Sequence, residues 1–388
     1  MLLSLIAFFI SSNANAWDKH QVLLQHLMDS RASKKRIYPY QKIVAPCPDA
    51  ERKELDLLGS ALHFNAAKVH LFSESRCKPN QLNYEVLVSD ILGSSVIDEP
   101  DLGMDQDLLD VDDPLHERNY MGGVAGPTSQ GFRHMYFSGM ELFSPFKTFQ
   151  FPPGKMGQAL ERIKTFREVS NAYFLRGDKF WGTRTLLWEL HYIQDLQQPF
   201  HVVQVPVLAM LPWNKLFKSF IKESARTLGN YHYAYEGLAL ALANEASTNH
   251  FAECFEPEEG FETIKVPAEL IAYPRSQSSE LTGAVYDLFG PSLKDSGVDL
   301  ANGVGALDYF EFLHLSESAI LPDEELKMLS TPEKKRMDLQ RKQFKAMGEI
   351  KQLTCDLMHR VSALTWDELD RSQLTPKGSA VPASKTEK

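Results

Sequence analysis

The sequence predicts an all-α fold in a single large helical domain. Segments with apolar residues at helical spacing recur along the chain, and none shows a convincing alternation of apolar and polar residues, which would indicate a half-buried strand. The composition is that of an ordinary globular protein, with 43% hydrophobic and 24% charged residues among 388, so a large core can form. The formal net charge of −10 argues against a basic groove for duplex nucleic acid.

Residues 1–16 are typical of a secretory signal peptide. An apolar run of about ten residues ends in the small-residue pattern Ala14-Asn15-Ala16 and is too short to span a bilayer, although a basic start is missing. Cleavage between Ala16 and Trp17 would leave Trp17 as the mature N-terminus. We therefore expect a secreted or periplasmic protein.

The four cysteines are widely spaced and form no CxxC motif, which excludes a thiolate zinc ribbon and favours disulfides in an oxidising compartment. Cys47 and Cys77 bracket one helix-like segment, so we expect these two to pair. A bond between Cys254 and Cys355 is the weaker expectation.

The helical pattern covers several segments in chain order. Helices are expected over residues 20–28, 48–72, 81–92, 156–175, 181–197, 230–242 and 322–369. The second carries Leu55, Leu58, Leu62, Ala66, Val69 and Phe72 at helical spacing, and the last carries Leu326, Leu339, Phe344, Met347, Ile350, Leu353 and Met358 as its inner stripe. Residues 98–131 are acidic and irregular, without the pattern of a calcium loop.

The organisation predicted from these segments has four parts. After the signal peptide, residues 17–250 form the helical core, residues 251–375 a helical extension packed on it, and residues 376–388 a disordered tail. The apolar and aromatic stretch 202–221 fits core packing best, with a surface that meets lipid headgroups as the alternative.

One stretch carries the strongest chemical signal. His191 and Asp195 lie one helical turn apart on one face, and Pro199 ends that helix so that His201 returns toward the same point. Imidazole nitrogens and carboxylate oxygens are ordinary zinc ligands. Alone, such a pair is more often a salt bridge than a metal site.

A second pair strengthens the metal interpretation. His232 and Glu236 repeat the i, i+4 spacing on another helix, and facing helices are where helical bundles build metal sites. A free amino group on Trp17 would form a chelate with its own carbonyl oxygen, and His20 follows on the first turn of a helix. Alone, His20 and His26 would be exposed histidines.

With these residues, the Gly93-Ser94-x-x-x-Asp98 segment and His134-Met135-Tyr136-Phe137, the sequence resembles the bacterial zinc-dependent phospholipase C family, which shares its fold and site with the single-strand-specific zinc nucleases. The similarity spans roughly residues 17–245. The resemblance implies an all-α fold with three clustered zinc ions.

Carried over by position, the resemblance implies the following ligands. Asp98, His134, His191 and Asp195 would hold the first zinc ion, His201, His232 and Glu236 the second, and Trp17 with His20 the third, with Asp195 bridging the first and third. Because two intervals differ from the family pattern, His26 is an alternative to His20, and Asp101 or Asp105 to Asp98. The chain also ends in helices instead of the lipid-binding β-sandwich of some family toxins.

The resemblance implies hydrolysis of a phosphodiester, with zinc lowering the pKa of a water and neutralising the phosphoryl oxygens, and with Asp98 assisting as a base. The preferred substrate is a phospholipid at a membrane surface, cleaved on the glycerol side by a monomeric enzyme. The alternative is a nuclease for single-stranded nucleic acid, whose bases would stack on Tyr136, Phe137, Tyr231 or Tyr233. A non-catalytic interaction protein stabilised by zinc is the third hypothesis.

Overall fold

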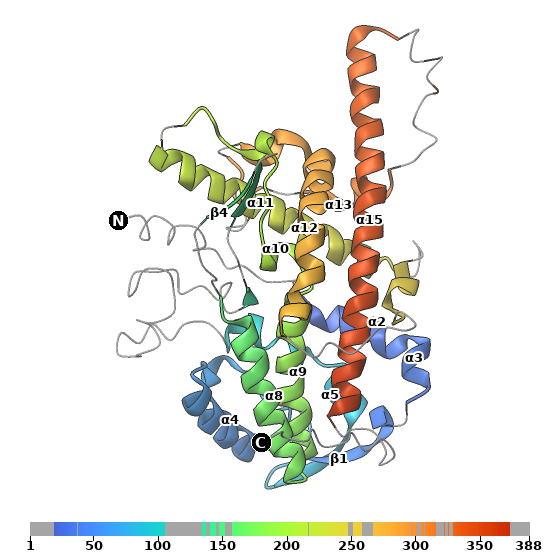
Figure 1. The fold of residues 1–388 in the computed structure, drawn as a ribbon. Coiled ribbons are helices and arrows are strands. Elements are labelled where there is room, and N and C mark those ends of the chain that lie inside the picture. The colour runs from blue at the N-terminus through green and yellow to red at the C-terminus, as the bar shows by residue number, and fades with distance from the viewer. Residues whose placement is uncertain are drawn as a thin grey trace, which may run out of the picture.

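The computed structural model describes residues 19–36, 38–104, 134–136, 140–144, 147–151, 157–215, 217–246, 251–257, 267–295, 297–300, 304–305, 307–315, 322, 325 and 329–372. The fold is all-α, as predicted (Figure 1). The α-helices are α2 (His20–Asp29), α3 (Arg31–Lys34), α4 (Pro48–Leu62), α5 (Val88–Leu92), α8 (Ala159–Leu175), α9 (Lys179–Asp195), α10 (Pro199–Val202), α11 (Phe217–Asn244), α12 (Pro267–Phe289), α13 (Tyr309–Leu313) and α15 (Thr331–Arg371).

Short non-α elements connect these helices. They comprise the 3-10 turns η2 (Tyr38–Tyr40), η3 (Ala66–Lys68), η4 (Ser95–Asp98), η7 (Leu208–Met210), η8 (Phe251–Phe255) and η9 (Gly290–Lys294), and the π-helical turn η5 (Pro100–Met104). Strands β1 (Lys42–Pro46) and β2 (Asn83–Leu87) form one antiparallel pair, with Val44 opposite Glu85, and β3 (Met140–Ser144) and β4 (Lys147–Phe151) form another.

Helix α9 lies at the centre of the fold. Every residue from Phe180 to Asp195 is buried, so this helix is enclosed on all sides. The side chain of Asp178 accepts a hydrogen bond from the backbone N–H of Trp181 and caps its first turn. A helix this deeply buried can hold polar side chains only where neighbouring elements supply their partners.

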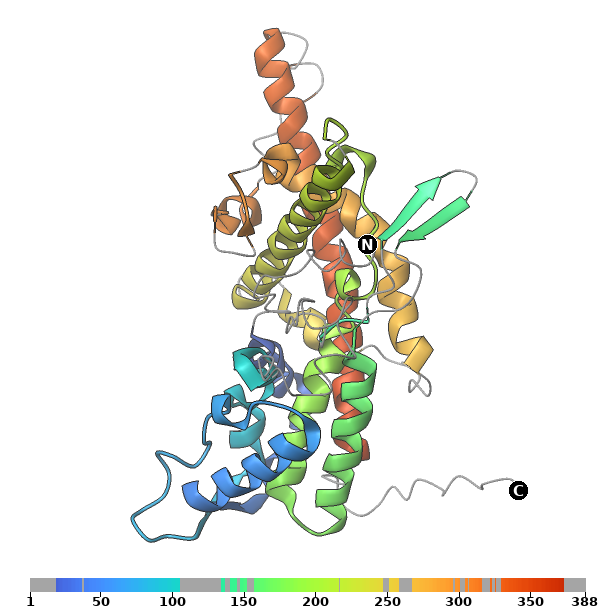
Figure 2. The ribbon, with the colours of Figure 1, turned by 90° about the vertical axis from the view of Figure 1, so that its left-hand side faces the viewer.

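Helix α15 runs along much of the molecule in both views, beside α12 and α9 (Figures 1 and 2). It begins with a capping box formed by Ser330 and Glu333. Near its C-terminal end, Leu364, Trp366 and Leu369 belong to the same buried cluster as Trp188 of α9. The chain's last long helix therefore contributes directly to the core around α9.

The structure corrects several predicted boundaries. The helix expected over 48–72 ends at Leu62, because His63 adopts the left-handed conformation with φ of 55°. Of the helix expected over 81–92, the first part is strand β2, and only Val88–Leu92 is helical. Helix α12 was not predicted, since Pro274 stands inside it. Leu339, predicted to face inward, is 49% exposed.

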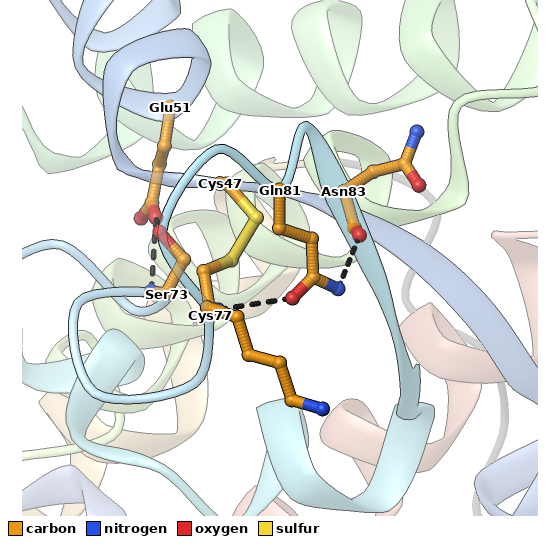
Figure 3. The surroundings of a disulfide bond; sticks show 7 residues. Cys47, Glu51, Ser73, Cys77, Gln81 and Asn83 are labelled. Atoms are coloured by element: carbon orange, nitrogen blue, oxygen red, sulfur yellow. Dashed lines mark hydrogen bonds between the residues drawn. A yellow bond between two sulfur atoms is a disulfide. The ribbon is translucent and has the colours of Figure 1, made fainter.

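Both expected disulfides are present, Cys47–Cys77 and Cys254–Cys355. Figure 3 shows the first bond where the start of α4 meets the loop that leads to β2. Two disulfides fit an extracellular or periplasmic protein. Among the described helices, none is both long and apolar enough to cross a membrane. The proposed signal peptide and the proposed disordered tail lie outside the described residues.

Candidate metal centre

The fold brings together imidazole and carboxylate side chains from six parts of the chain. Helix α9 supplies His191 and Asp195, and α10, which starts at Pro199, supplies His201. His232 and Glu236 lie on α11, His20 opens α2, Asp101 lies in η5, and His134 comes from a short described segment. All eight are buried.

The first group of donors consists of His134, His191 and Asp195. Asp195 Oδ2 lies 2.8 Å from His134 Nδ1 and 3.3 Å from His191 Nε2. The two imidazole nitrogens, His134 Nδ1 and His191 Nε2, are 2.8 Å apart. One donor atom from each residue therefore points to a common position.

The second group consists of His201, His232 and Glu236. Glu236 Oε1 lies 3.1 Å from His201 Nε2 and 2.8 Å from His232 Nε2. The side-chain amide of Gln198 donates to the same oxygen at 3.1 Å. Because His232 and Glu236 are four residues apart on α11, they face the same side of that helix.

The third group consists of His20, Asp101 and His191. His20 Nε2 lies 3.9 Å from Asp101 Oδ2, and His191 Nε2 lies 3.8 Å from Asp101 Oδ1. Asp195 is close to all three groups: its Oδ1 is 3.4 Å from His20 Nε2 and 3.5 Å from His201 Nδ1. Asp195 is thus the carboxylate around which the three groups gather.

The distances around Asp195 Oδ1 fit zinc. Ligand atoms about 2.0–2.2 Å from a tetrahedral ion are separated from one another by roughly 3.3–3.6 Å. Asp195 Oδ1 lies at that separation from His20 Nε2 and His201 Nδ1, and none of these three buried atoms has a hydrogen bond within the described part of the chain. Buried polar atoms normally have a partner, and a shared cation would satisfy Asp195 Oδ1 and His20 Nε2.

The chain matches none of the protein-family models, curated proteins or solved structures with which it was compared. Its function is therefore argued from the geometry of this centre.

The electrostatics keep the carboxylates ionised. Burial opposes ionisation of Asp195, but His191, His134 and His20 outweigh it and lower the pKa of Asp195 well below its usual value. Burial likewise opposes ionisation of Glu236, yet His232 and His201 lower its pKa to about 2. Burial and the neighbouring His20 lower the pKa of His191, which favours the neutral imidazole that a metal requires.

The structure places the two alternative carboxylates, Asp98 and Asp101, in different surroundings. Asp101, not Asp98, lies within the donor groups. Asp98 Oδ1 instead accepts the backbone N–H of Gln21 at 3.0 Å, at the N-terminus of α2, where a carboxylate is favourable. The role of Asp98 as a base stays a prediction.

His20, not His26, belongs to a donor group; His26 stacks on Phe255 with ring centroids 4.6 Å apart. Trp17 and Asp105 lie outside the described residues, so their part in metal binding stays a prediction.

Three buried glutamines around the end of α9 were missed in the sequence. Gln194 binds His20, Gln198 binds Glu236, and Gln197 donates to the carbonyl of Leu270. Amides are not typical zinc ligands, so a search for ligands passes over them. The sequence did contain one indication of them: three uncharged polar residues lie beside two expected ligands, in a segment whose other residues are typical of a core.

A buried ion cluster holds the segment that carries Asp101. Arg184 of α9 donates to both carboxylate oxygens of Glu99, and Trp188 Nε1 donates to Glu99 at 2.8 Å. Arg184 also binds Glu51, which in turn accepts the backbone N–H groups of Phe72 and Ser73. Glu99 stands two residues before Asp101, so this cluster fixes the turn that brings Asp101 to the donors.

A small pocket adjoins the second donor group. It is lined mainly by apolar side chains and by His232, and the lining residues are Phe200, Gln204, Val205, Pro206, Met210, Leu228, Tyr231, His232 and Thr282. Predicted core packing holds for part of the 202–221 stretch, since Met210 and Leu211 are buried, but Leu208 and Trp213 are each 63% exposed.

Proposed function

We propose that this protein is a secreted zinc-dependent phosphodiesterase, and specifically a phospholipase C that cleaves the glycerol-side phosphodiester of phospholipids. The observation that carries the proposal is the convergence of three His and carboxylate donor groups on the buried carboxylate of Asp195. Adjacent metal sites of this donor chemistry suit the in-line displacement of a phosphate ester.

The proposed ligands form three zinc sites. His134, His191 and Asp195 would hold one zinc ion, His201, His232 and Glu236 another, and His20 with Asp101 a third. When bound, zinc supplies Lewis-acid activation of water and neutralises charge on the phosphoryl oxygens. The buried protein groups keep the ligands oriented, and their low-dielectric surroundings strengthen every charge interaction at the reacting phosphate.

The surroundings of His232 favour a lipid substrate. A small, mainly apolar pocket lined by Phe200, Val205 and Met210 adjoins this ligand, so the site borders apolar side chains. The same stretch presents Leu208 and Trp213 to solvent, and the indole N–H of Trp213 is already bound to the carbonyl of Leu208 at 2.8 Å. An exposed Trp beside apolar residues suits the interface of a membrane.

The test is an assay of the purified mature protein on phosphatidylcholine vesicles and on denatured DNA, each with and without a chelator. Release of phosphocholine that the chelator abolishes and zinc restores would support the proposal. Cleavage of DNA without release of phosphocholine would overturn the lipid assignment.

A variant pair tests the lipid surface separately. Trp213→Ala should reduce activity on vesicles but leave hydrolysis of a soluble, short-chain lipid unchanged. The control is Leu82→Ala, because Leu82 is 82% exposed and precedes β2, away from the pocket. Equal activity of the two variants on vesicles would exclude a role for Trp213.

The second candidate function is hydrolysis of single-stranded nucleic acid. Tyr233 favours it, since this half-buried side chain stacks beside His232 with ring centroids 5.7 Å apart, and an aromatic ring beside the metals could receive a base. Tyr136, also half-buried, follows His134 closely in the chain. The DNA arm of the assay decides between the two functions.

The third hypothesis, a zinc-stabilised interaction protein without turnover, is tested at His201. A His201→Ala protein that folds normally but has lost hydrolysis of both substrates would argue against it. Absence of turnover by the wild-type protein on every phosphodiester, with zinc bound, would favour it.

A further inference from the structure

We infer that Gln194 is a positioning residue for the donor His20, and that the C-terminal helix α15 belongs to the metal centre because Thr365 holds Gln194. The inference rests on the proposed zinc site. It gives a role in the centre to a helix that lies far along the chain from every predicted ligand.

The contact between Gln194 and His20 fixes which ring nitrogen carries the proton. Gln194 Oε1 lies 2.9 Å from His20 Nδ1, and both residues are 0% exposed. An amide oxygen can only accept a hydrogen bond, so Nδ1 must carry the hydrogen. The lone pair of the neutral ring is then on Nε2, the nitrogen that faces Asp195 Oδ1 at 3.4 Å and Asp101 Oδ2 at 3.9 Å.

Thr365 holds the amide in this orientation. Gln194 Nε2 donates to Thr365 Oγ1 at 3.4 Å, and Thr365 is also 0% exposed. With the amide turned over, its N–H would face Nδ1 and would favour the proton on Nε2, where it blocks metal binding. The hydroxyl on α15 therefore anchors the amide that faces the His20 ring of α2.

This arrangement is the one that metal-binding histidines usually have. The second ring nitrogen of such a histidine donates to an oxygen that orients the ring, and loss of that partner lowers metal affinity by about 10–100-fold. Here the oriented ring belongs to the third donor group, His20 with Asp101 and His191. Loss of Gln194 should therefore weaken the binding of one zinc ion and leave the binding of the other two unchanged.

The experiment measures zinc affinity and the protonation of His20, not activity. Gln194→Met removes the acceptor, whereas Gln194→Glu keeps an oxygen that accepts from Nδ1. The matched control is Gln197→Met, because Gln197 is equally buried near the same helix end and its side chain binds Leu270 and Arg360, neither of which belongs to the proposed metal ligands. On α15, Thr365→Val is compared with Thr365→Ser and with Thr354→Val.

In competition with a chromophoric chelator, Gln194→Met should bind one zinc ion about 10–100-fold more weakly than the wild type. Gln197→Met should retain wild-type affinity, and Gln194→Glu should recover most of the loss. Thr365→Val should weaken the binding of the same zinc ion, whereas Thr365→Ser and Thr354→Val should not. Nitrogen NMR of the metal-free protein at alkaline pH, where the ring of His20 is neutral, should show a proton on Nδ1 in the wild type and a mixture of tautomers in Gln194→Met.

Equal zinc affinity of Gln194→Met and Gln197→Met, or a wild-type His20 with its proton on Nε2, would overturn the inference. If wild-type protein binds zinc in all three groups but hydrolyses no phosphodiester, the proposed function fails and the inference stands. If the zinc affinities contradict the inference while the wild type hydrolyses lipid, the inference fails and the proposed function stands.

Discussion

Replacement of Arg184 with methionine should be among the most damaging single changes outside the metal ligands. Arg184 is fully buried and binds Glu99 and Glu51, both of which are also buried. Methionine fills similar volume but leaves two buried carboxylates without their cation. Breaking a buried ion pair from one side costs about 3–5 kcal/mol, so we expect a loss of that size in the free energy of unfolding.

The loss should depend on pH with a definite sign. Burial raises the pKa of Glu99 even beside Arg184. Without the cation its pKa should rise further, and a carboxyl whose folded pKa is raised loses stability as the pH rises above its unfolded pKa. The deficit of Arg184→Met should therefore be larger at pH 8 than at pH 5, and adding Glu99→Gln should recover part of it at pH 8.

Urea unfolding at both pH values measures these effects. The control is Lys164→Met, because Lys164 and Glu168 form a pair 3.9 Å apart with side chains 78% and 68% exposed, and such surface pairs contribute at most about 1 kcal/mol. If Arg184→Met lowered the free energy of unfolding by less than about 1 kcal/mol, or by the same amount at both pH values, the buried ion cluster would not stabilise the fold as argued.

Two further predictions concern the disulfides and the second donor group. The disulfides close loops of 30 and 101 residues, and the chain entropy of these loops predicts how much stability each bond contributes. The free energy of unfolding should fall by about 3.6 kcal/mol in Cys47→Ser/Cys77→Ser and by about 4.7 kcal/mol in Cys254→Ser/Cys355→Ser. Urea unfolding that ranks the two variants the other way would contradict the entropic argument. In metal-free protein, ionised Glu236 stabilises the fold above its unfolded pKa of about 4.3, and this stability disappears as the pH falls toward its folded pKa of about 2. Glu236→Gln should flatten the stability profile across that range by up to about 1.4 kcal/mol per pH unit; parallel profiles would show that the pKa of Glu236 is not lowered.

The parts of the fold that the sequence predicted are those with long apolar periodicity. Helices α8 and α9 appear within a few residues of their expected bounds, and α15 ends near its expected end but starts nine residues later, at Thr331 instead of 322. The two antiparallel strand pairs were missed because a pattern over five residues does not separate a short strand from part of a helix. Helix α12 was missed because a proline normally interrupts a helix, and only tertiary packing decides that Pro274 is tolerated.

The candidate site shows a similar division. Residue types and i, i+4 spacing identified the pairs on α9 and α11, since helical geometry fixes which residues share a face. The choice between Asp98 and Asp101 could not be made in the same way, because it depends on a π-helical turn held by Glu99 and Arg184. The contact of Gln194 with Thr365 joins residues 171 apart in sequence, and no local pattern encodes it.

The central claim is that the donor groups around Asp195 bind zinc. Anomalous diffraction from the mature protein, recorded at the zinc absorption edge, tests it most directly. We predict about three zinc peaks per chain, one beside each of the donor sets His134/His191/Asp195, His201/His232/Glu236 and His20/Asp101. A single peak, no peak, or zinc bound away from these residues would contradict the account.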